Sequence, residues 1–128
     1  MRLWSAAAAI AASFVASAGH AQTEDWAPVT RHNGSAISID RNSVERQGGY
    51  VSVISRSMFD EIQPGGAKMY RVRYRYDCTN RTSDLLYFEI IDAGGRIIAR
   101  EEVEPENREV EPVPADSPNE AILALLCA

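Results

Sequence analysis

Hydrophobic and polar residues alternate along the middle of the chain, a pattern typical of β-strands with one buried face. The alternation is clearest over residues 68–78, where the even positions carry tyrosine, valine and cysteine and the odd positions include Arg71, Arg73 and Arg75. Because successive side chains of a strand point to opposite faces, Cys78 is expected on the aromatic, core side.

Further segments have the same strand character, and turn signals separate them. The two-residue turn Asn33-Gly34 is a strong hairpin signal, and glycines within 64–66 and 92–95 mark two more turns. The predicted strands are residues 26–30, 36–40, 50–59, 68–78, 85–91 and 96–103. We therefore expect a mainly β member of the α+β class, with a single antiparallel sheet of about five to six strands.

A short helix is predicted to close the chain and to pack on this sheet. It begins in Ser-Pro-Asn-Glu at 117–120, where serine is a good N-cap, proline suits the first helical position and glutamate completes a capping box. Ile122, Leu125 and Leu126 form its apolar stripe. The segment before it, 104–114, holds three prolines among glutamates, so we expect an extended connection without regular strand or helix.

The N-terminal residues resemble a secretory signal peptide. Arg2 is followed by an uncharged, alanine-rich run over 3–15 and then by small residues, with cleavage predicted after Ala21. The run is shorter than the about 20 residues that a transmembrane helix needs. We therefore predict a signal peptide at 1–21, a single domain at 22–128, and a periplasmic or secreted protein without stable membrane insertion. No cysteine lies at the cleavage site, so lipid attachment there is not predicted.

Two cysteines, Cys78 and Cys127, occur in the chain. In an exported domain an even pair is expected to form a disulfide, which here would tie the C-terminal helix to the sheet. A free thiol pair or half of a metal site is the alternative that the spacing leaves open.

Charge excludes some partners and suggests others. The net charge of −5 argues against nucleic acid and anionic lipid. The charge is uneven, however, because residues 101–111 hold six glutamates and residues 71–81 hold four arginines. The row Arg71, Arg73 and Arg75 could grip an acidic protein segment, a phosphate or a sulfated glycan. Alternatively, it pairs with glutamates of neighbouring strands, such as Glu89, Glu101 and Glu102.

No residue set predicts catalysis. The expected mature domain has one histidine, His32, in a predicted turn, and the adjacent Glu101 and Glu102 are expected to point to opposite faces of a strand. The glycine pairs match no phosphate-binding pattern, and we expect neither enzyme activity nor a cofactor or metal. Tyr70, Tyr74 and Tyr76 could serve a carrier of haem or another small ligand, but their shared face with Cys78 favours core packing.

The order of several short motifs resembles the surface-adhesin protein E family. These motifs are Trp26, residues 39–44, Tyr76-Asp77-Cys78, Arg81, residues 117–120 and Cys127. The resemblance spans nearly the whole predicted mature chain. It implies a small secreted domain with an antiparallel sheet and a C-terminal helix joined to a strand by a disulfide. By similarity to the founding adhesin of the family, the resemblance also implies binding to host matrix proteins and association with haem.

The sequence thus predicts a non-enzymatic exported binding or interaction module of the bacterial cell envelope, with an unidentified protein or acidic ligand as partner. The alternatives are a surface adhesin for host matrix protein and a carrier of haem or another small ligand. Pairing of an edge strand with a second copy, to form a homodimer, also stays open.

Overall fold

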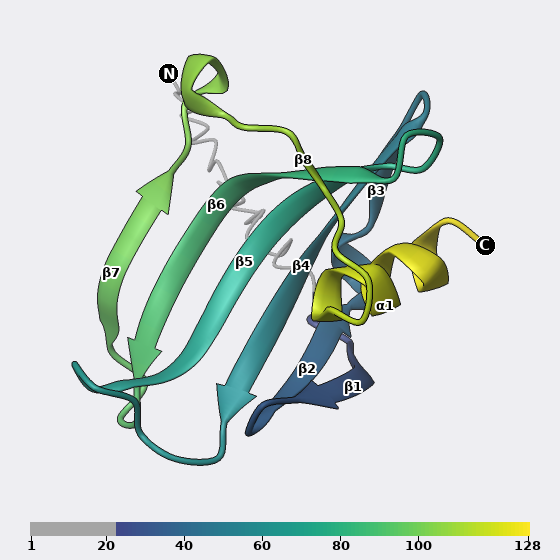
Figure 1. The fold of residues 1–128 in the computed structure, drawn as a ribbon. Coiled ribbons are helices and arrows are strands. Elements are labelled where there is room, and N and C mark those ends of the chain that lie inside the picture. Colours follow the sequence, from purple (N-terminus) through teal and green to yellow (C-terminus); the bar gives the residue numbers. More distant parts are fainter. Residues whose placement is uncertain (1–22) are drawn as a thin grey trace, which may run out of the picture.

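The antiparallel sheet expected from the alternation is present, and it has eight strands (Figure 1). The computed structural model describes residues 23–128. Six strands coincide with the predicted segments, and the remaining two are short. The strands are β1 Trp26–His32, β2 Ser35–Asp40, β3 Glu45–Gln47, β4 Tyr50–Phe59, β5 Ala67–Asp77, β6 Thr82–Asp92, β7 Ile97–Glu102 and β8 Glu111–Pro112.

The strand order is β1-β2-β4-β5-β6-β7, with β3 paired to β4 and β8 paired to β6. Chain neighbours are therefore mostly sheet neighbours, as short turns require. Asn33 and Gly34 close the β1–β2 hairpin with positive φ values of 43° and 78°, the conformation that this turn demands. The β5–β6 register shifts between Arg73 and Tyr74, and such an irregularity increases the local twist of a sheet.

Two predictions need correction. The sheet has eight strands and not five to six, because β3 and β8 are too short to show a period of two. The segment 104–114 was expected to contain no regular structure, yet it includes a 3₁₀ turn at Pro105–Asn107 and strand β8. Pro112 is tolerated in β8 because this strand lies at the edge of the sheet.

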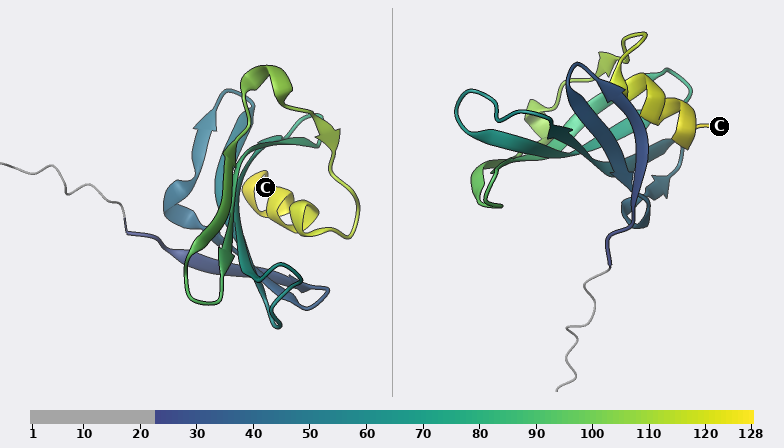
Figure 2. Two further views of the ribbon diagram at one scale, coloured as in Figure 1. Left: turned by 90° about the vertical axis from the view of Figure 1, so that its left-hand side faces the viewer. Right: turned by 90° about the horizontal axis from the view of Figure 1, so that it is seen from below.

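The core lies between one face of the sheet and the C-terminal helix α1, Pro118–Leu126. Figure 2 shows that α1 lies on one side of the sheet. Val51, Val53 and Tyr76 from the sheet are at most 1% exposed, as are Ile122 and Leu123 from the helix. Leu126, from the predicted stripe, is also buried, whereas Leu125 is 55% exposed, so this part of the stripe prediction is wrong.

The predicted disulfide joins Cys78 to Cys127, at a sequence separation of 49 residues. It fixes the last turn of α1 to the end of β5, on the core side where the alternation places Cys78. A nine-residue helix is marginal on its own, so packing and this bond hold it in place.

The predicted signal peptide, residues 1–21, lies outside the described residues. Within 23–128, no helix has the length and apolar character needed to cross a membrane.

Candidate functional site

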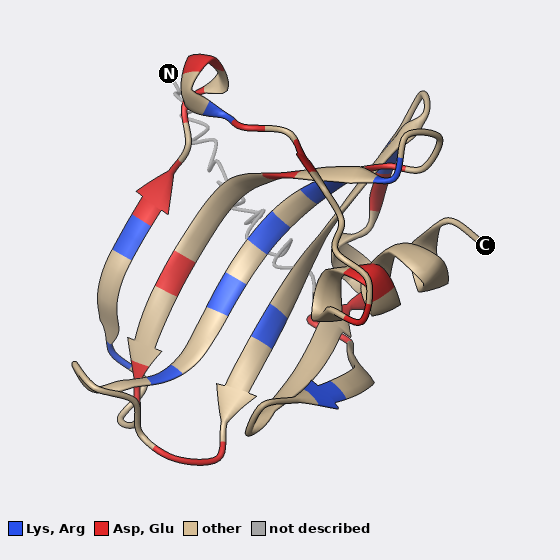
Figure 3. Ribbon diagram, viewed as in Figure 1, with Lys and Arg blue, Asp and Glu red and all other residues tan. Residues whose placement is uncertain are grey.

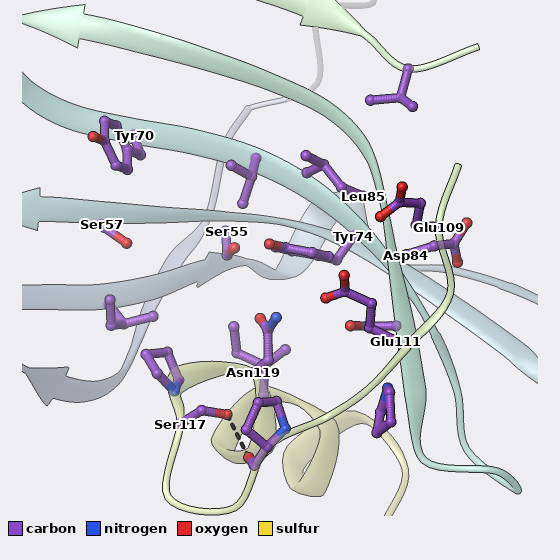
Figure 4. Close-up of a pocket in the computed structure, with 18 of the residues that line it drawn as sticks. Ser55, Ser57, Tyr70, Tyr74, Asp84, Leu85, Glu109, Glu111, Ser117 and Asn119 are labelled. Carbon is purple, nitrogen blue, oxygen red and sulfur yellow. Dashed lines mark hydrogen bonds between the residues drawn. The ribbon is translucent and has the colours of Figure 1, made fainter. Parts of the chain in front are cut away.

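A groove of about 600 Å³ opens beside the core on the helix side of the sheet. Its three walls are the sheet, the crossing segment and helix α1 (Figure 4). We use crossing segment for residues 103–117, which run from the end of β7 to the start of α1. Helix α1 packs on residues of β2, β4 and the end of β5, and the groove opens beside its first turn.

Strands β4 and β5 supply the sheet wall. Tyr70 and Tyr74 project from β5, and Ser57 and Ser55 lie beside them on β4 (Figure 4). The register brings Ser57 opposite Tyr70, and Val53 opposite Tyr74. The wall thus presents hydroxyl groups and two phenol rings, with Tyr70 39% exposed.

Tyr76 continues this row but belongs to the core. It is fully buried, and its hydroxyl donates a hydrogen bond of 2.9 Å to Asn119 Oδ1 on α1. Burial raises the pKa of its phenol above the ordinary value of 10.0. The expectation of core packing is therefore confirmed for Tyr76, whereas Tyr70 and Tyr74 line the groove.

The crossing segment forms the second wall and is fixed at two points. Strand β8 pairs Glu111 with Ser83 of β6, and Val113 N donates to Arg81 O at 3.0 Å. These contacts place Glu111 beside Tyr74 and opposite the helix, and Glu109 farther along the same wall, near Asp84 (Figure 4). The segment is thus exposed over most of its length, yet it is fixed to the sheet and forms one wall of the groove.

The start of α1 forms the third wall, and its cap is the one that the sequence predicts. Ser117 Oγ accepts a hydrogen bond from Glu120 N at 3.2 Å and donates one to Pro114 O at 2.7 Å. The Glu120 carboxylate in turn accepts from Asp116 N. Ser117 is therefore the predicted N-cap, but the return bond of Glu120 reaches the N–H of Asp116 and not that of Ser117. Asn119, in the first turn of the helix, is presented toward Tyr74 (Figure 4).

The groove carries uncompensated negative charge. Three acidic residues line it, and Asp84 is neutralised by two hydrogen bonds from Arg75, at 3.1 and 3.0 Å. Within residues 23–128, neither Glu109 nor Glu111 has an ion-pair partner within 4.0 Å, and no lysine or arginine lines the groove. The arrangement suits a cation that contacts ring faces and carboxylates together.

The three predicted arginines lie on the opposite face of β5, where basic positions form a band across β4 and β5 (Figure 3). Each has an acidic neighbour, as the second interpretation of this row expects. Arg75 forms the buried pair with Asp84, and Arg73 Nη1 donates to Ser52 Oγ at 2.9 Å and lies 4.0 Å from Glu45.

Arg71 contacts Glu24 at 2.7 Å and Glu89 at 3.8 Å. Glu89 is the partner that the sequence suggested for this row. Glu101 and Glu102, also suggested, form no ion pair among the described residues.

His32, the histidine considered for catalysis, lies at the β1–β2 turn, where its Nε2 is 3.0 Å from Asn33 Nδ2, and it does not line the groove. In the part of the chain that the structure describes, no cluster of three or more His, Cys, Asp or Glu residues could hold a metal ion.

Sequence reasoning did not identify the site residues Glu109, Glu111, Ser55, Ser57 and Asn119. The glutamates stand in the acidic run that was noted, but a charge run does not reveal which of its members face inward. The serines carry a weak signal, since they occupy the core face of 50–59 where apolar residues are expected. Polar residues on the core face of a strand indicate that a groove, and not packed core, lies over them.

Comparison with known proteins places these features in context. The family model described as surface-adhesin protein E matches residues 26–128. Crystal form II of Haemophilus influenzae protein E is 13% identical at a TM-score of 0.53, over 82% of this chain and 95% of that chain. A second structure of H. influenzae protein E is 13% identical at 0.52, over 81% and 91%. Protein E from non-typeable H. influenzae is 12% identical at 0.52, over 78% and 74%. Among curated proteins, no match was found.

Proposed function

The chain belongs to the surface-adhesin protein E family, and on this premise we propose that it is an exported, non-enzymatic binding protein of the cell envelope. Its ligand site is the groove between the sheet, the crossing segment and α1. Its ligand is a cationic group, namely the guanidinium or ammonium of a basic side chain on a partner protein. The observation that carries this proposal is the lining of the groove, which combines Glu109 and Glu111 with Tyr74.

Physical chemistry favours such a ligand for this lining. A cation over a phenol ring gains about 0.5–2 kcal/mol, with the larger value for a desolvated pair. Carboxylates without intramolecular partners add charge-assisted hydrogen bonds when a guanidinium approaches. An anionic ligand would meet the repulsion of Glu109 and Glu111, and an apolar one would leave the hydroxyls of the sheet wall without partners.

The test is a calorimetric titration of the full chain with acetyl-arginine amide and with a tetra-arginine peptide. Glu109→Gln/Glu111→Gln is expected to weaken binding about fivefold or more, because it removes both charges from the groove. The matched control is Glu104→Gln/Glu106→Gln, which removes two exposed charges from the same region of the chain without touching the groove lining. Equal affinities for the two double variants would refute this assignment of the ligand.

A second variant tests the aromatic wall. Tyr74→Leu removes the ring face but keeps an apolar side chain against the core, and we expect it to weaken binding about threefold. Tyr74→Phe keeps the ring and should bind as the unmodified protein does. If Tyr74→Phe lost as much affinity as Tyr74→Leu, the phenol hydroxyl and not the ring face would be the contact.

Adhesion to host matrix protein is the rival function that family membership supports. It requires the protein to stand outside the outer membrane, whereas a periplasmic protein is shielded. Labelling of intact cells with a membrane-impermeant reagent separates the two. Labelled protein with an intact groove would favour the adhesin, and unlabelled protein recovered from the periplasmic fraction would favour the envelope binding module.

A further inference from the structure

The face of the sheet opposite the groove carries a pair of arginines that this fold leaves short of negative charge. Arg56 of β4 and Arg71 of β5 lie directly opposite each other in the register. Like charges at such positions repel, because Cβ atoms there are only about 5 Å apart. Something must therefore hold the two guanidinium groups side by side.

Trp26 of β1 is one part of what holds them. The Arg56 guanidinium carbon lies 4.1 Å from the centre of a Trp26 ring, and that of Arg71 lies 5.7 Å away. The two guanidinium groups therefore converge on a single indole. Cation–π contacts of this kind orient the cations, but they do not neutralise their charge.

Glu24 supplies the neutralising charge, and it does so for one arginine. Its Oε2 lies 2.7 Å from Arg71 Nη2, and the Glu24 side chain is 48% exposed. Glu89 is farther from Arg71, at 3.8 Å, and lies closer to Arg100, at 3.2 Å. Arg56 forms no ion pair with any residue of 23–128. The buried Nε atoms of both arginines also have no hydrogen-bond partner among the described residues.

We propose that Trp26, Arg56 and Arg71 form a carboxylate-binding clamp, which Glu24 occupies until the acidic side chain of a partner peptide displaces it. Glu24 precedes β1 and is exposed, so it can leave without breaking a strand or opening the core. Two coplanar donors on each guanidinium match the two oxygens of a carboxylate. The clamp is independent of the groove, because β5 directs Arg71 and Tyr70 to opposite faces.

This site replaces the predicted row of three arginines. Arg75 is committed to the buried Asp84, and Arg73 to Ser52 and to the backbone of Ser43. The acidic neighbour of Arg73, Glu45, is also exposed but lies 4.0 Å away, whereas Arg71 has an exposed acidic partner at hydrogen-bond distance, Glu24 at 2.7 Å. The functional neighbour of Arg71 is Arg56, on the adjacent strand.

The test uses Trp26 as its own reporter. In the full chain with Trp4→Phe, Trp26 is the sole tryptophan, and its fluorescence can be titrated with a tetra-glutamate peptide. We expect a saturable change that weakens as salt rises, because both binding charges are partly exposed. Arg56→Gln/Arg71→Gln should abolish it, whereas Arg31→Gln/Arg96→Gln, at exposed positions away from Trp26, should leave it intact.

Glu24→Gln is expected to change the affinity for the peptide in the opposite direction. This test does not depend on whether the double arginine variant folds. Removing the internal carboxylate should tighten binding of the peptide by about threefold. Unchanged or weaker binding would overturn the proposal, as would the absence of a saturable signal. Titrations with inorganic phosphate and sulfate complete the test. Equal or tighter binding of either ion would overturn the assignment to a carboxylate.

Discussion

The two faces of strand β5 use large side chains in different ways. On the helix side, Tyr76 is covered by α1 and buried, while Tyr70 stands in the open groove a few residues away. On the other side, no α-helix of residues 23–128 covers the strand, and Arg75 and Arg71 are held in place by Asp84 and Glu24. The stability of the first face comes mainly from exclusion of water, and that of the second from paired charge.

The difference explains why the candidate sites on the two faces carry opposite charge. Beside the start of α1, the helix side exposes rings and hydroxyls with unpaired glutamates nearby. Where the acidic partners run out, the other side exposes a guanidinium. The groove thus lies where α1 no longer covers the sheet, and the arginine clamp lies where acidic partners are lacking.

Loss of the disulfide is the largest change expected for the helix side. Cys78→Ala/Cys127→Ala removes a bond that closes a loop of 49 residues, and we expect a loss of about 4 kcal/mol on the chain-entropy model. Urea denaturation of the double variant measures this. A midpoint equal to that of the oxidised parent would show that α1 is held by packing alone.

Truncation within the helix should be nearly as costly. Leu123 is fully buried, so Leu123→Ala is expected to lower the free energy of unfolding by about 3 kcal/mol. Leu125, two residues along, is 55% exposed and serves as the matched control, with a loss below about 0.5 kcal/mol for Leu125→Ala. Similar losses in thermal denaturation for both variants would contradict the orientation of α1.

We expect substitutions on the arginine side to cause smaller losses of stability, since the ion pairs there are partly solvated. Arg75→Gln leaves the Asp84 carboxylate, 5% exposed, without its partner, and we expect a loss of about 2 kcal/mol after allowance for the exposed end of the arginine. Arg31→Gln breaks an exposed pair with Asp60 and should cost about 0.5 kcal/mol or less. Stability unaffected in both variants would show that charge pairing does not hold this face.

The smallest effect concerns alkaline pH. Because burial raises the pKa of the Tyr76 phenol above 10.0, the unfolded chain releases this proton first. Its contribution to stability is therefore present below pH 10 and is lost as pH rises further, by about 1 kcal/mol per pH unit. Denaturation midpoints at pH 9 and pH 11 measure the loss, and Tyr76→Phe should reduce it.

Much of the fold could be predicted because its signals are local. The period of two over β5 placed Tyr76 and Cys78 on the core side, and the Ser117 capping box marked the start of α1. Strands β3 and β8 could not be predicted, since three and two residues carry no usable period.

The sites were harder to predict because they depend on distant contacts. Glu111 faces Tyr74 because β8 joins the edge of β6, and nothing near Glu111 in the sequence signals that pairing. Similarly, the β4–β5 register places Arg56 opposite Arg71. Strand β2 lies between β1 and β4, so the strand order brings Trp26 of β1 to both arginines. The row of three arginines was visible in the sequence. The side chains that bind two of them, Ser52 for Arg73 and Asp84 for Arg75, could not be identified from it.

The bond between Cys78 and Cys127 also has a consequence for timing. One wall of the groove belongs to α1, a helix too short to persist without its covalent tether. A newly made chain whose sulfur atoms are still reduced therefore lacks a complete recess. We expect ligand binding on this face to require disulfide formation. The reduced protein should therefore not bind cationic partners until a thiol oxidant has acted on it.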